Sequence, residues 1–132
     1  MPAGPAAAAP GPAARLDVLV VDDDPLIVEA TVALLSGLGH TPHAAADIAG
    51  ALPFSRRVDA VLADYRLAGD EDGLSLIAAM RAEMPGLPAL LITAEDNPAI
   101  RRRAAQMAVA MLTKPASPGA IAVFLARVSS SG

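Results

Sequence analysis

The chain has 132 residues, of which 54% are hydrophobic and 2% aromatic, and its formal net charge is −4. This composition favours one domain with a sheet covered by helices, and its acidic balance argues against general affinity for nucleic acid. Without cysteine, and with no apolar run of the roughly 18 residues that span a bilayer, we expect a cytoplasmic protein that makes no membrane contact through this segment.

Residues 1–15, almost all proline, alanine and glycine, indicate a flexible linker or tail. We expect one domain over residues 16–129 and a short tail at 130–132. Within the domain, short apolar runs alternate with segments of helical period, which is typical of repeated strand–helix units. The strands are expected at residues 16–21, 40–46, 58–63, 88–92 and 108–112. The helices are expected at residues 25–38, within 47–57, at 73–83, at 98–107 and from residue 118 onward.

Three of the expected helices begin in the same way. Asp24, Asn97 and Ser117 are each followed by proline, so a capping side chain precedes a residue that suits the first helical turn. The segment 47–57 contains both Gly50 and Pro53, and its helix is therefore expected to be short.

Residues able to take part in phosphate chemistry follow four of the apolar runs. Asp22 and Asp23 follow the first, Asp64 the second, Thr93 the third and Lys114 the fourth. The carboxyl ends of parallel strands meet at one edge of a sheet, so these side chains are expected to share a pocket. Carboxylates about 4 Å apart repel by roughly 4 kcal/mol at an effective dielectric constant near 20. Mg²⁺, with Mn²⁺ as a substitute, or the lysine would compensate this charge, and a carboxylate beside such a cation can attack a phosphoryl group.

Four motifs carry a resemblance to a known family: VLVVDDDP at 18–25, VLADYRL at 61–67, LLITAED at 90–96 and LTKP at 112–115. Together they resemble the receiver domain of two-component response regulators. The resemblance implies a (βα)₅ flavodoxin-like fold, with a doubly wound parallel five-stranded sheet in three α/β/α layers. It is strongest to receivers attached to hybrid sensor histidine kinases, so we expect an excised receiver, with a stand-alone regulator as the second reading.

The resemblance also implies roles for the acidic residues. Asp64 is the expected phosphoacceptor and one of the metal ligands. Asp23 is expected to bind the metal directly, and Asp22 to act largely through metal-bound water. The main-chain carbonyl of Arg66 is expected to be a further ligand.

Thr93 and Lys114 take the family's phosphate-contacting and switch-coupling roles, and the bond from Lys114 to Pro115 is often cis in receivers. The chain departs from the family at two positions. Met111 replaces the usual aromatic residue that turns inward when the threonine moves, and Ala116 replaces a large residue. We therefore expect phosphoryl acceptance to be retained, while the readout through the switch positions 93 and 111 takes another form.

The expected function is that of a switch rather than an enzyme. A histidine kinase or a histidine phosphotransfer protein would donate a phosphoryl group to Asp64, with Mg²⁺ required. A homodimer through the fourth helix, fifth strand and fifth helix is a further expected interaction.

Two other functions remain open. A haloacid-dehalogenase-type phosphatase would use Asp22 as nucleophile with Asp24 beside it, although no acidic pair follows Lys114 as that class requires. A degenerate receiver would serve only to bind proteins.

Some polar residues are given a structural reading. The acidic segment 69–73 is expected to be a solvated loop without ligands, and His40 and His43 to be surface or strand residues. The run 101–103, three arginines, is expected to be a solvated face, with docking of an acidic partner as the alternative.

Overall fold

The computed structural model describes residues 15–131, so the linker expected at residues 1–15 lies outside the described residues except for its last position. Five parallel strands form one sheet in the order β2-β1-β3-β4-β5. The strands are β1 (Asp17–Val21), β2 (Thr41–Ala45), β3 (Ala60–Asp64), β4 (Ala89–Thr93) and β5 (Ala110–Thr113). The helices are α1 (Pro25–Gly37), α2 (Ile48–Ala51), α3 (Gly73–Glu83), α4 (Pro98–Gln106) and α5 (Pro118–Ser131). The predicted flavodoxin-like fold is confirmed.

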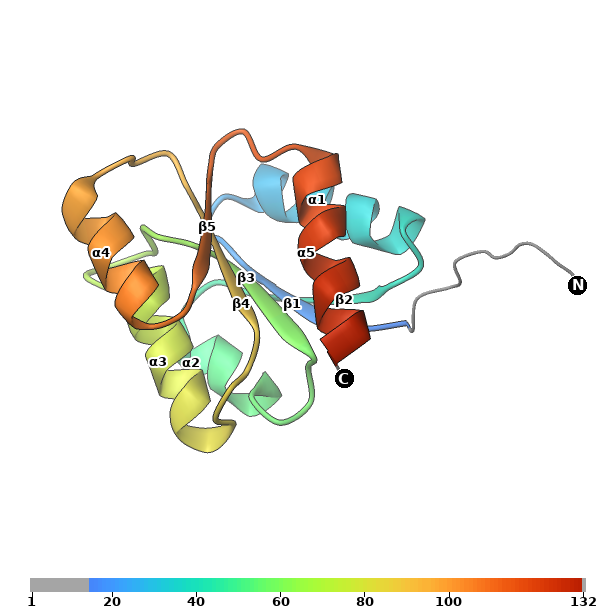
Figure 1. The fold of residues 1–132 in the computed structure, drawn as a ribbon, viewed down its shortest axis with the longest axis horizontal. Coiled ribbons are helices and arrows are strands. Elements are labelled where there is room, and N and C mark those ends of the chain that lie inside the picture. The colour runs from blue at the N-terminus through green and yellow to red at the C-terminus, as the bar shows by residue number, and fades with distance from the viewer. Residues whose placement is uncertain (1–14, 132) are drawn as a thin grey trace, which may run out of the picture.

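The sheet separates two apolar layers, because successive strand residues point to opposite faces. On β1, Leu19 and Val21 belong to the layer beneath α2, α3 and α4, whereas Val18 and Val20 belong to the layer beneath α1 and α5. Figure 1 shows the two groups of helices on opposite sides of the sheet. All four of these side chains are buried. The strands are apolar on both faces, as expected for a parallel sheet covered twice.

The predicted caps set the starts of the first and fourth helices. The Asp24 side chain accepts a hydrogen bond from the backbone N–H of Leu26, and the Asn97 side chain accepts one from Ala99. The Ser117 hydroxyl likewise accepts a hydrogen bond from the backbone of Ala120 at the start of α5. These bonds satisfy donors that the helices cannot satisfy themselves.

Two segments allow the expected helix boundaries to be compared with the structure. The region 47–57 contains only the four-residue α2 and a 3₁₀ turn, Leu52–Phe54, in agreement with the expected short helix. At the other end, α5 continues to Ser131, past residue 129 where we expected the domain to end. Within residues 15–131, none of the helices is long and apolar enough to cross a bilayer.

Candidate functional site

Three aspartates meet at the carboxyl edge of the sheet. Asp22 and Asp23 directly follow β1, and Asp64 ends β3, which is the strand beside β1. One carboxylate oxygen from each lies within 4.8 Å of the other two. Asp22 is buried, Asp64 is half-buried and Asp23 is exposed, so the group is open to solvent on one side. An all-oxygen set of this kind, with carboxylates close together, fits a hard divalent cation such as Mg²⁺.

Lys114 lies at the same edge and contacts two of the aspartates. Its Nζ is 3.0 Å from Oδ2 of Asp64 and 3.2 Å from Oδ2 of Asp22. The peptide bond that follows it, to Pro115, is cis. One ammonium group therefore offsets part of the charge of two carboxylates.

Burial and neighbouring charges shift the pKa values of Asp64 and Lys114. Burial raises the pKa of the Asp64 carboxyl, and the charge of Asp22 adds to the rise, while the hydrogen bond and charge of Lys114 oppose it. Burial acts to lower the pKa of Lys114, but the hydrogen bonds and charges of Asp64 and Asp22 together outweigh it, so the pKa is raised. The site therefore holds its ammonium group protonated next to a carboxylate that bears its charge at a cost.

Thr93 ends β4 and is 1% exposed. Its hydroxyl oxygen accepts a hydrogen bond from the backbone N–H of Glu95 at 3.0 Å, and its carbonyl accepts one from the backbone N–H of Lys114 at 2.8 Å. Glu95 in turn binds the guanidinium of Arg66, with Nη2 to Oε2 at 2.7 Å. The loops that follow β3 and β4 are thus joined beside the aspartates. Sequence reasoning did not assign Glu95 a role, because an acidic residue in a loop gives no signal until its partner is seen.

The loop between β3 and α3 closes tightly against the end of β3. Gly73 begins α3, and a Cβ at this position would stand only 2.2 Å from the carbonyl oxygen of Asp64. Its backbone N–H also donates to the carbonyl of Tyr65 at 2.7 Å. Only glycine permits so close an approach.

Two acidic residues of this loop, Glu71 and Asp72, are not in the solvated position that we expected. The Glu71 carboxylate accepts a hydrogen bond from the backbone N–H of Ile48 at 2.8 Å, so it caps α2. The Asp72 carboxylate caps α3 through the backbone N–H of Ser75, also at 2.8 Å. Both residues are half-buried. The prediction of a solvated loop was wrong for these two residues because the two helix starts need acceptors, which their carboxylates supply. Gly69 and Asp70 are exposed, as predicted.

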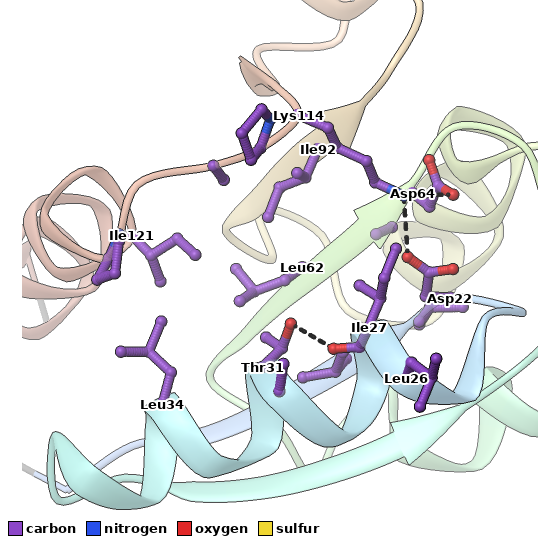
Figure 2. Close-up of a pocket in the computed structure, with 17 residues that line it drawn as sticks. Asp22, Leu26, Ile27, Thr31, Leu34, Leu62, Asp64, Ile92, Lys114 and Ile121 are labelled. Atoms are coloured by element: carbon purple, nitrogen blue, oxygen red, sulfur yellow. Dashed lines mark hydrogen bonds and ion pairs between the residues drawn. The ribbon is translucent and has the colours of Figure 1, made fainter.

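An apolar groove of about 670 Å³ leads away from the aspartates between α1 and α5 (Figure 2). Asp22, Asp64 and Lys114 lie at one end, and Leu34 and Ile121 face each other at the other. Its remaining walls are mostly apolar side chains of α1, the strands and the segment 115–118.

The two positions that depart from the receiver pattern lie on opposite faces of the sheet. Met111 is half-buried and packs on the layer beneath α3 and α4. Ala116 packs on the other layer and lines the groove, where its methyl group fills little space. Asp24, which the phosphatase reading placed beside the nucleophile, caps α1 instead.

A family model for the response regulator receiver domain matches residues 18–126. The transcriptional regulatory protein TcrX of Mycobacterium tuberculosis, described as probable, is 41% identical over 81 residues, which are 60% of this chain and 34% of TcrX. The chain thus spans about a third of that relative's length.

Two solved structures resemble the chain over most of its length. The chemotaxis protein CheY4 of Vibrio cholerae matches with a TM-score of 0.78 and 27% identity, covering 87% of this chain and 99% of the other. The signal receiver domain of an HD domain-containing protein from Pseudomonas fluorescens matches with a TM-score of 0.80 and 27% identity, covering 90% of this chain and 100% of the other.

Proposed function

The chain belongs to the response regulator receiver domain family, and we propose that Asp64 is its phosphoacceptor. The observation that carries this proposal is the position of Lys114, whose ammonium group lies between the carboxylates of Asp64 and Asp22. A cation held there is placed to neutralise charge on a phosphoryl group as it reaches Asp64.

We propose Mg²⁺ as the cofactor, with Mn²⁺ able to replace it. Asp22, Asp23 and Asp64 supply the carboxylate oxygens, and the Arg66 carbonyl is the further ligand. When bound, Mg²⁺ neutralises charge on the acidic group and on the phosphoryl oxygens. The closeness of the three carboxylates supports this assignment, because Lys114 alone leaves them with a net negative charge.

The transfer is a displacement at phosphorus. An Asp64 carboxylate oxygen forms the new P–O bond as the P–N bond to the donor histidine breaks, and the electron pair of that bond stays on the imidazole nitrogen. Lys114 stabilises the negative charge on the phosphoryl oxygens. The Thr93 hydroxyl donates its own hydrogen to one of them, and its oxygen can keep accepting from the backbone N–H of Glu95.

We propose a histidine kinase or histidine phosphotransfer protein as the donor. The groove between α1 and α5 supports this, since it offers apolar contact area that opens beside Asp64. Leu26 stands at its rim and is 73% exposed, so it extends the apolar surface of the groove toward solvent. The function is that of a phosphorylated switch rather than a catalyst acting on free substrates.

Acetyl phosphate with Mg²⁺ tests the assignment directly. Mass spectrometry should find one acid-labile phosphoryl group on the wild-type chain and none on Asp64→Asn. Labelling that persists in Asp64→Asn and is lost in Asp22→Asn would place the nucleophile as in the phosphatase class. No labelling of the wild-type chain by acetyl phosphate or by a phosphorylated kinase would instead indicate a receiver used only for protein binding.

A further inference from the structure

The loop from Tyr65 to Gly73 is closed by its own backbone. Besides the bond between those two residues, the N–H of Leu67 donates to the carbonyl of Glu71 at 3.2 Å, and Arg66 pairs with Asp72 as an antiparallel bridge. Asp72 is therefore the direct backbone neighbour of Arg66. The bonds of Leu67 and Gly73 flank this pair, so the position of Asp72 constrains the backbone of Arg66, whose carbonyl we assign to the metal.

Besides its bonds to Ser75 at the start of α3, Asp72 contacts a side chain from α4. Arg103 Nη1 lies 3.3 Å from Oδ1 of Asp72 and 3.4 Å from Oδ2, and its Nη2 donates to the Ser75 hydroxyl at 2.9 Å. The Ser75 hydroxyl also donates to Asp72 Oδ2 at 3.1 Å. The three side chains form one network in which the carboxylate is 23% exposed and the guanidinium 42%. A planar guanidinium in such a network fixes orientation as well as distance.

The contact between Arg103 and Asp72 joins α4 to the loop that follows Asp64. Arg103 is 31 residues from Asp72 in the chain, and α4 and α3 are neighbours beneath the same face of the sheet. We propose that Arg103 is a positioning residue for the acidic site. Through Arg103, the position of α4 is coupled to the binding of metal between the aspartates. This inference rests on the proposed function, because it takes the Arg66 carbonyl as a metal ligand.

Linkage makes the effect reciprocal. If the Arg103 contact favours the loop conformation that binds metal, then bound metal favours the contact, and α4 is held more firmly when the site is filled. This route passes through side chains of the loop and α4 and needs no aromatic ring at position 111. It therefore supplies a connection from the site to α4 in a chain that has Met111 there.

Metal titration with two arginine variants tests the proposal. Tyr65 is the sole tyrosine of a chain without tryptophan and stands next to Asp64, so its fluorescence reports on metal binding there. Arg103→Met removes the contact, and Arg102→Met removes an exposed arginine one position earlier on the same helix. We expect the dissociation constant for Mg²⁺ to rise about three- to tenfold in Arg103→Met and to stay unchanged in Arg102→Met.

A third variant separates the ion pair from the helix cap. Asp72→Asn keeps an oxygen that can cap α3 but removes the charge that attracts Arg103. It should weaken Mg²⁺ binding as Arg103→Met does, and the double variant should be no weaker than either single one. Hydrogen exchange supplies a second measurement: Mg²⁺ should slow exchange of α4 amides in the wild type and in Arg102→Met only.

The outcomes distinguish this proposal from the function on which it rests. Equal Mg²⁺ affinity in Arg103→Met and Arg102→Met, with normal titration of the wild type, would overturn the coupling and leave the phosphoacceptor site intact. Strictly additive losses in the double variant would also overturn it. A wild-type chain that binds Mg²⁺ but takes no phosphoryl group would contradict the proposed function without touching the linkage.

Discussion

The ammonium group of Lys114 lies 3.0 Å from the carboxylate of Asp64, although 50 residues separate them in the chain. The contact exists because β5 and β3 flank β4 in a parallel sheet and end at the same edge. It brings a cation to a carboxylate whose pKa burial has raised.

Lys114→Met should destabilise the metal-free protein. Without the ammonium group, Asp22 and Asp64 face each other uncompensated, and we expect the free energy of unfolding to fall by about 1–3 kcal/mol. Mg²⁺ should restore most of the loss. Urea unfolding followed by circular dichroism, with and without Mg²⁺, measures both effects. Arg56→Met, which removes an exposed arginine elsewhere, is the control for net charge and should change little.

The stability that Lys114 provides should depend on pH in a defined direction. Its pKa is raised in the folded chain from the ordinary value of 10.5: burial opposes the rise, but the hydrogen bonds and charges of Asp64 and Asp22 outweigh it. The contribution is therefore complete below that value and is lost as pH rises through the folded-state pKa. The difference in unfolding free energy between wild type and Lys114→Met should be constant through neutral pH and shrink above about pH 10.5. A difference that grows in this range would contradict the sign.

Gly73→Ala should damage both the fold and the site. Its methyl group would collide with the carbonyl oxygen of Asp64, so we expect a loss of about 1–3 kcal/mol in unfolding free energy and weaker Mg²⁺ binding. Gly119→Ala is the matched control, because nothing lies within 4 Å of its added methyl group. In α5 it should be neutral or stabilise by up to about 1 kcal/mol. Thermal unfolding of the two variants distinguishes steric conflict from a general effect of replacing glycine.

Leu26→Glu should separate small donors from protein donors. The side chain lies at the rim of the groove, so a charge there should slow transfer from a phosphorylated kinase by about tenfold, as expected for loss of an apolar anchor. Labelling by acetyl phosphate should be unchanged, since Leu26 is not among the residues assigned to the chemistry. Val123→Glu, an exposed apolar position on α5 that does not line the groove, should leave both rates unaltered. If Leu26→Glu slowed labelling by acetyl phosphate and by the kinase equally, the substitution would act on the phosphoryl-transfer site and not on donor binding.

The resemblance to receiver domains implied the fold, and one rule was sufficient to predict that the site residues meet. Parallel strands end at a common edge, so Asp22, Asp64 and Lys114 had to approach once the strands were identified. The contact of Arg103 with Asp72 follows from no such rule. It depends on the distance between α3 and α4 and on the conformation of the Arg103 side chain. A local sequence pattern predicts neither of these.

The groove was equally hidden in the sequence. It exists because small side chains, among them Ala30 and Ala116, line α1 and the segment before α5 without filling the space between them. A cavity between helices produces no periodic pattern in the sequence from which it could be predicted. The sequence shows that position 116 is alanine, but the groove that results depends on how α1 and α5 are arranged.

The placement of the helices on opposite faces of the sheet has a consequence for how signals are timed. The groove proposed to receive the phosphodonor lies on the face covered by α1 and α5, while α4 and the Arg103 network lie on the other face. If the proposed donor site is correct, a partner bound on α4 would leave the groove open. The phosphoryl group could then be delivered without an exchange of partners.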